Sequence, residues 1–366
     1  MKVPLLDLKP QYESIRKEVD DAIREVLSKS SFILGPYVEK FEKEITAYTG
    51  TKHAIGVASG TDAILISLMA LGIKPGDEVI TTPYTFFATA GSVSRLGAKP
   101  VFVDIDPDTY NINPGQITKE INDNTKAVIP VHLYGQCAEM DEILKIAGEN
   151  GLKVAEDAAQ SIGAEYKERS SGSMGDTGCL SFFPSKNLGC CGDGGMVVTN
   201  NEEIAEKIKI LRVHGSKPKY YHPVIGLNSR LDSIQAAILS VKLKYLERWA
   251  ESRRINAIKY NELLKDTPVG TPFVESYNLH VYNQYVIRVN DRDGLQKHLA
   301  GKGIETALYY PLPLHLQECY RELGYKEGDF PEAEKAAKET LSIPVFPELK
   351  DEQLRHVAES IKEYLI

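Results

Sequence analysis

The chain lacks a paired-cysteine motif, and it has no long apolar run. Its cysteines do not form a CxxC pair and their number is odd, which argues against a disulfide framework and against a zinc site. We therefore expect a reducing cytoplasm around the protein and five small, buried cysteine side chains. No stretch approaches the ~18 consecutive apolar residues of a membrane span, and residues 1–7 lack the apolar region of a signal peptide. The cysteines are Cys137, Cys179, Cys190, Cys191 and Cys319.

The chain also has no excess of basic over acidic residues. The 366 residues carry 43 Lys and Arg against 51 Asp and Glu, a formal net charge of −8, which disfavours nonspecific nucleic-acid binding. The histidines do not cluster, since His132, His214 and His222 fall on different predicted elements, so we expect no metal site. No GxGxxG opens a strand–helix unit, which argues against a nicotinamide oxidoreductase.

What the chain does contain is an alternation of short apolar strands with helices. With 42% hydrophobic residues, this rhythm predicts an α/β protein with a mostly parallel central sheet covered by helices on both faces. Apolar residues at helical spacing predict helices at 11–29, 37–49, 60–72, 86–96, 139–149 and 202–211. The predicted strands are 78–82, 100–104, 127–132, 153–156, 179–183 and 196–199.

The last third of the chain has a different pattern of predicted elements. A single charged helix is predicted over about 230–264. Beyond it come a strand at 284–289 and helices at 294–301, 331–340 and 351–364. We place a domain boundary near residue 245, which gives a large domain over 1–245, with an N-terminal helical segment, and a smaller C-terminal α/β domain over 246–366.

One lysine and one acid stand out in this frame. Lys186 lies in the run Ser181–Leu188, which is otherwise small and apolar, and a glycine-rich segment follows it. Asp157 ends the apolar strand that begins near Val154. An unpaired charge is costly to bury. Pyridoxal phosphate explains both residues, because it takes a lysine as a Schiff base and pairs its pyridinium nitrogen with a carboxylate.

The surrounding residues fit the same cofactor. Gly60 and Thr61 open a helix whose N-terminus suits a phosphate, although Ser59 or Thr61 could instead only cap that helix. Ser181 places a hydroxyl five residues before Lys186. Phe86 follows a strand and could stack on a planar ring or only pack in the core. Asp157 as a helix cap and Lys186 as a surface lysine are further alternatives. The combination, in this order on one parallel sheet, favours the cofactor.

Five segments resemble the DegT–StrS family of nucleotide-sugar aminotransferases, which have the aspartate aminotransferase fold (fold type I). The resemblance runs from Leu5 to Pro344. It implies a pyridoxal phosphate enzyme with a large domain around a mostly parallel sheet and a smaller C-terminal domain. The segments are Gly60–Ala63, Thr85–Phe86, Glu156–Gln160, Ser181–Lys186 and Gly226–Asp232.

The resemblance also implies roles for single residues. Lys186 would form the covalent Schiff-base link and shuttle the proton. Asp157 would bind the pyridine nitrogen and Gln160 the ring hydroxyl. The family is dimeric with shared sites. Phe86 would stack on the ring, Gly60, Thr61 and Ser181 would hold the phosphate, and Asn228 would reach the phosphate from the partner subunit.

For the substrate, the likeness points to enzymes that aminate C3 of a 3-oxo sugar, UDP-2-acetamido-2-deoxy-3-oxo-glucuronate in the first place, with glutamate as amino donor. Arg230 could pair with the uronate carboxylate, or internally with Asp232. Tyr309 and Tyr310 could bind the sugar or the diphosphate. Tyr309 departs from the family pattern, in which a histidine often precedes the Tyr-Pro, so a dTDP-3-oxo-6-deoxyhexose is the second substrate prediction.

Two other functions are compatible with the same fold. A non-catalytic regulatory protein would bind without chemistry, and fold alone does not settle activity. A C3-dehydratase of the same family would carry histidine at the lysine position. Lys186 argues against both, because neither needs a Schiff-base lysine.

Overall fold

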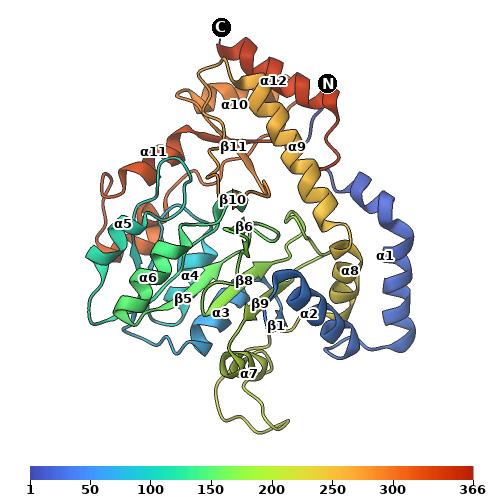
Figure 1. Cartoon of the computed structure of the whole chain (residues 1–366), viewed down its shortest axis with the longest axis vertical. Helices are drawn as coiled ribbons and strands as arrows, with labels where there is room; N and C mark the ends of the chain where they lie inside the picture. Colours follow the sequence, from blue (N-terminus) through green and yellow to red (C-terminus); the bar gives the residue numbers. More distant parts are fainter. Residues whose placement is uncertain (366) are drawn as a thin grey trace.

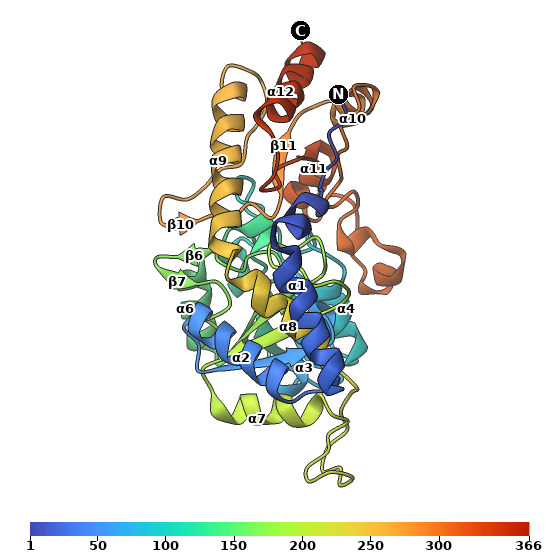
Figure 2. The ribbon, with the colours of Figure 1, turned by 90° about the vertical axis from the view of Figure 1, so that its right-hand side faces the viewer.

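The computed structural model describes residues 1–365 and is built around a central sheet (Figures 1 and 2). Within these residues seven strands pair in the order β1-β9-β8-β5-β4-β2-β3. All strands are parallel except β9, which is antiparallel to both its neighbours. The prediction of a mostly parallel sheet is therefore confirmed. The strands are β1 His53–Val57, β2 Glu78–Thr81, β3 Lys99–Phe102, β4 Thr125–Val128, β5 Lys153–Asp157, β8 Thr177–Ser181 and β9 Gly195–Thr199.

Side chains of successive strand residues alternate between two apolar cores, one on each face of the sheet. Cys179 packs on the face covered by α3 (Gly60–Ala70) and α7 (Glu202–Leu211). Its neighbour Leu180 packs on the opposite face, against α2 (Pro36–Thr49) and α8 (Ser233–Leu243). Burial on both faces explains why the strands have nearly continuous apolar sequences.

The predicted helix over 230–264 is wrong as a single element. The structure divides it into α8 and α9 (Leu246–Leu264). At the break, the N–H of Tyr245 bonds to the carbonyl of Lys242, three residues back, instead of four. The ring of Tyr245 then stacks on Trp249, with centroids 5.9 Å apart. The segment contains no glycine or proline, so its local sequence carried no signal for a break.

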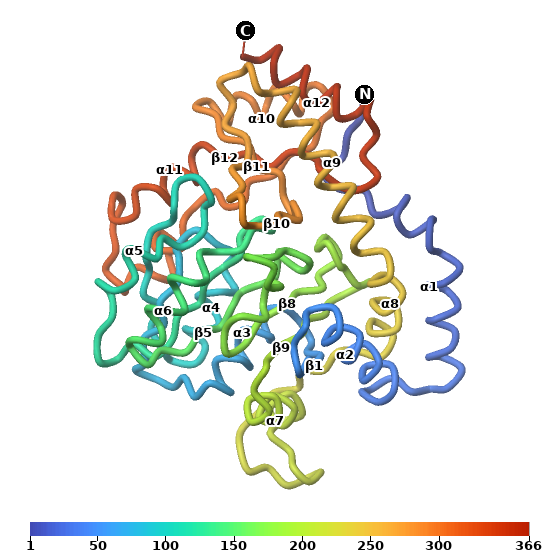
Figure 3. The backbone as a smooth tube through the Cα atoms, in the orientation of Figure 1, coloured from blue at the N-terminus to red at the C-terminus, as the bar shows by residue number. Residues whose placement is uncertain are grey.

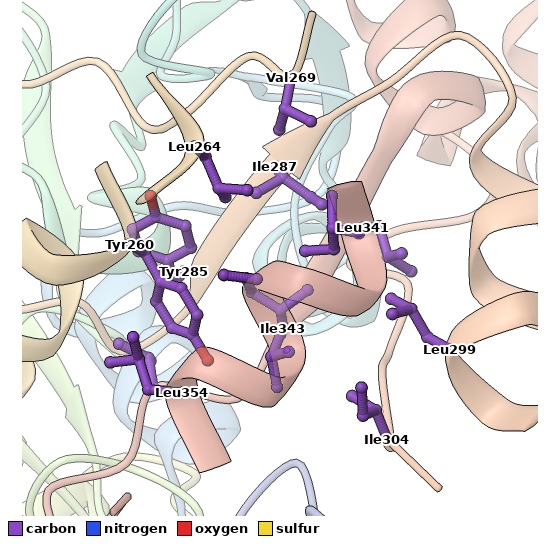
Figure 4. Packing of buried hydrophobic residues seen from close by; sticks show 14 of the residues in the cluster. Tyr260, Leu264, Val269, Tyr285, Ile287, Leu299, Ile304, Leu341, Ile343 and Leu354 are labelled. Atoms are coloured by element: carbon purple, nitrogen blue, oxygen red, sulfur yellow. The ribbon is translucent and has the colours of Figure 1, made fainter. Parts of the chain in front are cut away.

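A third core lies towards the C-terminus (Figure 4). It surrounds the antiparallel pair β11 (Tyr285–Arg288) and β12 (Thr340–Ile343), and Tyr260 and Tyr285 pack there with centroids 5.1 Å apart. Val3 joins this core and bridges to Ile304, so the chain begins beside its C-terminal part, and Figure 3 shows the two termini at one end of the molecule. The domain boundary near residue 245 stays a prediction.

The other elements connect and cover these cores. Two of the five cysteines, Cys191 and Cys319, are exposed, so the prediction that all five are buried is wrong for these two. No helix within residues 1–365 is long and apolar enough to cross a membrane. The remaining helices are α1 Lys9–Lys29, α4 Ala88–Arg95, α5 Pro114–Ile117, α6 Met140–Asn150, α10 Arg292–Gly301, α11 Pro331–Glu339 and α12 Asp351–Leu365, and the remaining short strands are β6 Glu165–Tyr166, β7 Arg169–Ser170 and β10 Asn278–Leu279.

Candidate active site

A cavity of about 450 Å³ opens at one edge of the central sheet. It brings together nine of the eleven site residues that the sequence predicts. Asn228 and Arg230 are not among its lining residues. The nine are Gly60, Thr61, Phe86, Asp157, Gln160, Ser181, Lys186, Tyr309 and Tyr310.

The topology of the sheet explains why these residues meet. Asp157 ends β5 and Ser181 ends β8, while Gly60 and Phe86 follow β1 and β2. The carboxyl ends of parallel strands share one edge of a sheet, and ligands bind at that edge in open α/β folds. Residues more than 100 positions apart in sequence therefore line one cavity.

Helix α3 begins at the cavity wall, and Ser59 caps it. The Ser59 hydroxyl accepts the N–H of Asp62 at 3.1 Å, and its carbonyl accepts the N–H of Ala63 at 2.9 Å. The capping alternative is thus correct for Ser59, but the cap leaves the N–H groups of Gly60 and Thr61 free of intrahelical partners. Helix N-termini of this kind attract anions.

Gly60 and Ser181 are in close approach. A Cβ atom on residue 60 would lie 2.6 Å from the Cβ and 2.9 Å from the hydroxyl of Ser181. A Cβ on Gly195, at the start of β9, would lie 2.3 Å from the backbone of Ser59. Both positions therefore require glycine, and the absence of side chains brings the start of α3 against the ends of β8 and β9.

Asp157 is buried at the floor of the cavity. Its Oδ2 accepts the Thr89 hydroxyl at 2.7 Å, and its Oδ1 accepts the N–H of Ala159 at 3.2 Å. Burial raises the pKa of this carboxyl, while the bonds from Thr89 and Ala159 and the nearby Lys186 oppose the rise. Neither hydrogen-bond donor carries a charge, so the carboxylate is held in place without a cation bonded to it.

Lys186 faces the same cavity from the loop after β8. Its backbone N–H bonds to the carbonyl of Phe183 at 2.8 Å, and the next residue, Asn187, donates its amide to the carbonyl of Val281 at 3.1 Å. Burial lowers the pKa of Lys186 to about 8, with Asp157 acting in the opposite direction. The amine therefore loses its proton at a lower pH than an ordinary lysine, which favours a role as nucleophile or proton carrier.

Gln160 and Tyr310 form a pair on the wall beside Asp157. The Gln160 oxygen accepts the backbone N–H of Tyr134 at 2.8 Å, and its amide nitrogen donates to the Tyr310 hydroxyl at 3.1 Å. The Tyr310 ring lies 6.1 Å from the ring of Phe86, which is 57% exposed within the cavity lining. The uncovered face of Phe86 fits a planar ring better than core packing.

Sequence reasoning missed the roles of Glu156 and Thr89. Glu156 is fully buried and accepts the N–H groups of Gly172 and Gly175, at 2.9 and 2.6 Å, as well as His132 Nε2 at 2.8 Å. It therefore joins the loop after β7 to β5. For Thr89 the sequence held no signal, because its bond to Asp157 joins residues 68 positions apart.

Asn228 and Arg230 flank a buried anchor, Ser229, whose hydroxyl accepts the N–H of Ala58 at 3.1 Å. Asn228 is exposed and Arg230 half-buried. The predicted alternative, an internal pair between Arg230 and Asp232, has no counterpart among the ion pairs of residues 1–365. The bond of Ser229 holds both residues near the end of β1, and neither lines the cavity.

Comparison with known proteins decides the family. The model of the DegT/DnrJ/EryC1/StrS aminotransferase family matches residues 13–362. The chain belongs to this family. Its members are pyridoxal phosphate-dependent sugar aminotransferases, so the resemblance read from the sequence, the fold type and the cofactor are all confirmed.

Two relatives cover essentially the whole chain. A "Pleiotropic regulatory protein" of Geobacillus stearothermophilus is 57% identical over 100% of this chain and 99% of its own length. The UDP-2-acetamido-2-deoxy-3-oxo-D-glucuronate aminotransferase of Pseudomonas aeruginosa is 44% identical over 98% of this chain and 99% of its own. Among solved structures, that of S. venezuelae DesV in complex with a ketimine intermediate is 43% identical, with a TM-score of 0.97 over 100% of this chain and 98% of that one.

The cavity of this DegT-family chain fits the cofactor. The carboxylate of Asp157 has only uncharged donors, which leaves room for a pyridinium as its cationic partner. The contact between Gly60 and Ser181 forms a cradle at a helix N-terminus, where a phosphate is stabilised. Within residues 1–365, no group of three or more His, Cys, Asp or Glu side chains could hold a metal ion.

Proposed function

We propose that this sugar aminotransferase transfers an amino group from an amino acid, glutamate in the first place, to C3 of a nucleotide-linked 3-oxo sugar. The proposed substrate is UDP-2-acetamido-2-deoxy-3-oxo-glucuronate. The observation that carries the proposal is the meeting of Lys186 and Asp157 in one cavity whose lining includes a helix N-terminus. A nucleophilic amine, a carboxylate and an anion site are the groups that pyridoxal phosphate requires.

Lys186 is the proposed covalent attachment point and proton carrier. Burial keeps a large share of its amine neutral near pH 8, so Nζ can attack a carbonyl and later accept a proton from carbon. Pyridoxal phosphate, when bound, supplies an electron sink that stabilises negative charge on the substrate carbon. The loop bonds at Phe183 and Asn187 hold Nζ at the cavity wall while the proton moves.

The other lining residues bind and orient. Asp157 pairs with the ring nitrogen, and an opposite charge beside it keeps the carboxyl ionised despite burial. Gln160 would donate an amide N–H to the ring hydroxyl, because its oxygen is engaged by Tyr134 and its other N–H by Tyr310. Gly60, Thr61 and Ser181 hold the phosphate, and Phe86 stacks on the ring.

Asn228 and Arg230 act in the site of a partner subunit in this proposal. Asn228 is exposed, Arg230 is half-buried, and neither lines the cavity of its own chain. The bond of Ser229 to Ala58 fixes the residue between them. A homodimer would then complete each site, with Asn228 at the phosphate. A stable, active monomer would contradict this arrangement.

Arg230 is the residue that favours a uronate as the sugar substrate. Its guanidinium can bind a carboxylate through two parallel hydrogen bonds, and a relative that is 44% identical is named for the uronate substrate. Tyr309 supports the second candidate, a dTDP-3-oxo-6-deoxyhexose. A tyrosine hydroxyl lacks the positive charge that a histidine could offer to a carboxylate.

A regulatory role is the other function that a relative suggests, since the 57% identical chain is named a regulatory protein. Pure binding needs no amine of lowered pKa opposite a buried carboxylate. Lys186 and Asp157 therefore favour catalysis.

A turnover panel tests the proposal. Purified protein with pyridoxal phosphate and glutamate is offered UDP- and dTDP-linked sugars, each as the 3-oxo and the 4-oxo form, and amino-sugar formation is followed by mass spectrometry. The proposal expects the UDP-linked 3-oxo uronate to give the highest kcat/KM. Preference for a 4-oxo sugar would overturn the C3 assignment, and preference for the dTDP sugar would select the second candidate.

A further inference from the structure

Two threonine hydroxyls form a chain that ends on the Asp157 carboxylate. Thr89 Oγ1 lies 2.7 Å from Asp157 Oδ2, and Thr85 Oγ1 lies 3.0 Å from Thr89 Oγ1. All three residues are buried. Thr89 lies in the first turn of α4, and Thr85 precedes that helix and lines the cavity. The chain therefore runs from the cavity wall to the back of the carboxylate.

The direction of the hydrogen bonds follows from proton counting. An ionised carboxylate only accepts hydrogen bonds, so Thr89 must donate its single hydroxyl hydrogen to Asp157. Thr89 then has only lone pairs to offer Thr85, and Thr85 must donate to Thr89. If Asp157 were protonated, its own hydrogen could point at Thr89 and the chain would lose this fixed order. The arrangement is thus matched to a charged Asp157.

We propose that Thr89 is a positioning residue that keeps Asp157 ionised and turned towards the ring nitrogen of the cofactor, and that Thr85 orients the Thr89 hydroxyl. The inference rests on the role proposed for Asp157. Hydrogen bonds to a charged acceptor are stronger than neutral ones, and they strengthen when each donor in a chain is itself an acceptor.

The electrostatics around Asp157 make this donor necessary. Burial raises the pKa of Asp157, and the Thr89 bond is the first of the influences that oppose the rise. Without Thr89, the carboxyl would compete for the proton of the ring nitrogen and leave that nitrogen neutral. The other titratable groups that face or adjoin Asp157 are Lys186, His132, Tyr310, Cys179 and Glu156.

The test measures the protonation of the cofactor ring directly. Holoenzyme is prepared with pyridoxal phosphate labelled with ¹⁵N in the ring, and the ¹⁵N chemical shift is followed with pH. Wild-type protein is expected to show a protonated ring nitrogen at neutral pH. Thr89→Val keeps the shape and loses the donor, so its ring nitrogen should become neutral at a lower pH, and the cofactor should dissociate about tenfold more readily.

Matched variants separate positioning from general destabilisation. Thr89→Ser restores the donor and should restore both readouts. Thr85→Val should give a smaller shift, and none when Thr89 is already valine. Thr81→Val is the control, because Thr81 is equally buried and its hydroxyl donates to the carbonyl of Ile129 at 2.9 Å, away from Asp157. It should leave the ¹⁵N shift and cofactor affinity unchanged.

Two results would contradict the inference, and they are distinguishable from failure of the role of Asp157. A Thr89→Val holoenzyme with the wild-type ¹⁵N titration and affinity would overturn the inference alone. An Asp157→Ala holoenzyme that keeps a protonated ring nitrogen would overturn the role of Asp157, and the inference with it.

Discussion

The side-chain oxygen of Gln160 accepts the backbone N–H of Tyr134 at 2.8 Å, and this bond fixes the orientation of the Gln160 amide. The amide nitrogen must then face Tyr310, to which it donates at 3.1 Å. Amide groups are ambiguous in orientation unless their partners decide it, and here the N–H of Tyr134 can only be a donor. Gln160 therefore has an amide N–H left to donate to the ring hydroxyl that we propose it binds.

Gln160→Glu should weaken cofactor binding at least about tenfold. The glutamate keeps an oxygen for the N–H of Tyr134 but replaces the amide donor by a carboxylate oxygen, which repels a ring oxygen and loses a hydrogen bond of about 1.5 kcal/mol or more. The dissociation constant of pyridoxal phosphate, measured by equilibrium dialysis, checks this. Gln116→Glu, the same change in α5 outside the cavity, should leave the constant as it is. Equal affinities in all three proteins would refute the orientation argument.

The sequence could predict the residues that end or follow parallel strands. The needs of pyridoxal phosphate link Asp157 with Lys186, and a helix N-terminus that suits its phosphate adds Gly60. The sheet itself is readable from the alternation of apolar strands with helices. The family resemblance added their individual roles, which remain proposals.

Other features of the structure depend on contacts that the identity of a single residue does not predict. Tyr134 holds Gln160 through a backbone N–H, which any residue possesses. The break between α8 and α9 contains no glycine or proline, and the stacking of Tyr245 on Trp249 accompanies it. The antiparallel direction of β9 was also beyond sequence reasoning, since the strand is as apolar as its parallel neighbours.

Gly60→Ala should abolish tight cofactor binding. The new Cβ would lie 2.6 Å from the Cβ of Ser181, so the start of α3 and the end of β8 must separate, and the phosphate would lose contacts to one or both. The loss of affinity should be tenfold or more, measured by fluorescence titration with pyridoxal phosphate.

Gly148→Ala is the control for that prediction. Residue 148 lies inside α6 with open space around a new Cβ, so alanine should stabilise the protein by about 0.5–1 kcal/mol and leave cofactor affinity unchanged. If Gly60→Ala bound the cofactor like Gly148→Ala, the close approach of α3 and β8 would have no part in phosphate binding.

Lys186→Met should stabilise the cofactor-free protein at neutral pH. Burial lowers the pKa of Lys186 from 10.5 to about 8, so the unfolded chain binds more protons than the folded chain between pH 8 and 10.5. Wild-type stability therefore rises with pH through this window, and the cost of the lysine is fully present below pH 8. The variant should gain about 2 to 3 kcal/mol at pH 7 in urea unfolding.

The pH dependence is the decisive part of that comparison. The gain of Lys186→Met over wild type should shrink from pH 8 upwards and level off above pH 10.5, where both states hold a neutral amine. Lys74→Met, a substitution of an exposed lysine, should show no such trend. A gain that stays constant across pH would mean that methionine packs better and that the lysine carries no charge penalty.

Arg230→Ala should reduce kcat/KM for a UDP-linked 3-oxo uronate about tenfold to a hundredfold, the effect of losing a charge-assisted pair of hydrogen bonds. Turnover of a dTDP-linked 6-deoxyhexose, which has no carboxylate, should change little. Arg230→Lys keeps the charge without the planar guanidinium, so its kcat/KM for the uronate should lie between those of wild type and Arg230→Ala. Equal losses on both sugars would remove the carboxylate as the partner of Arg230.

Borohydride reduction of the holoenzyme, followed by peptide mass spectrometry, tests the central claim most directly. Lys186 is the proposed covalent attachment point of pyridoxal phosphate, so the peptide that contains Lys186 should carry the reduced cofactor, and Lys186→Ala protein should carry none. Trapping in Lys186→Ala equal to that in wild type, or an adduct on a different lysine of the wild-type chain, would contradict the account.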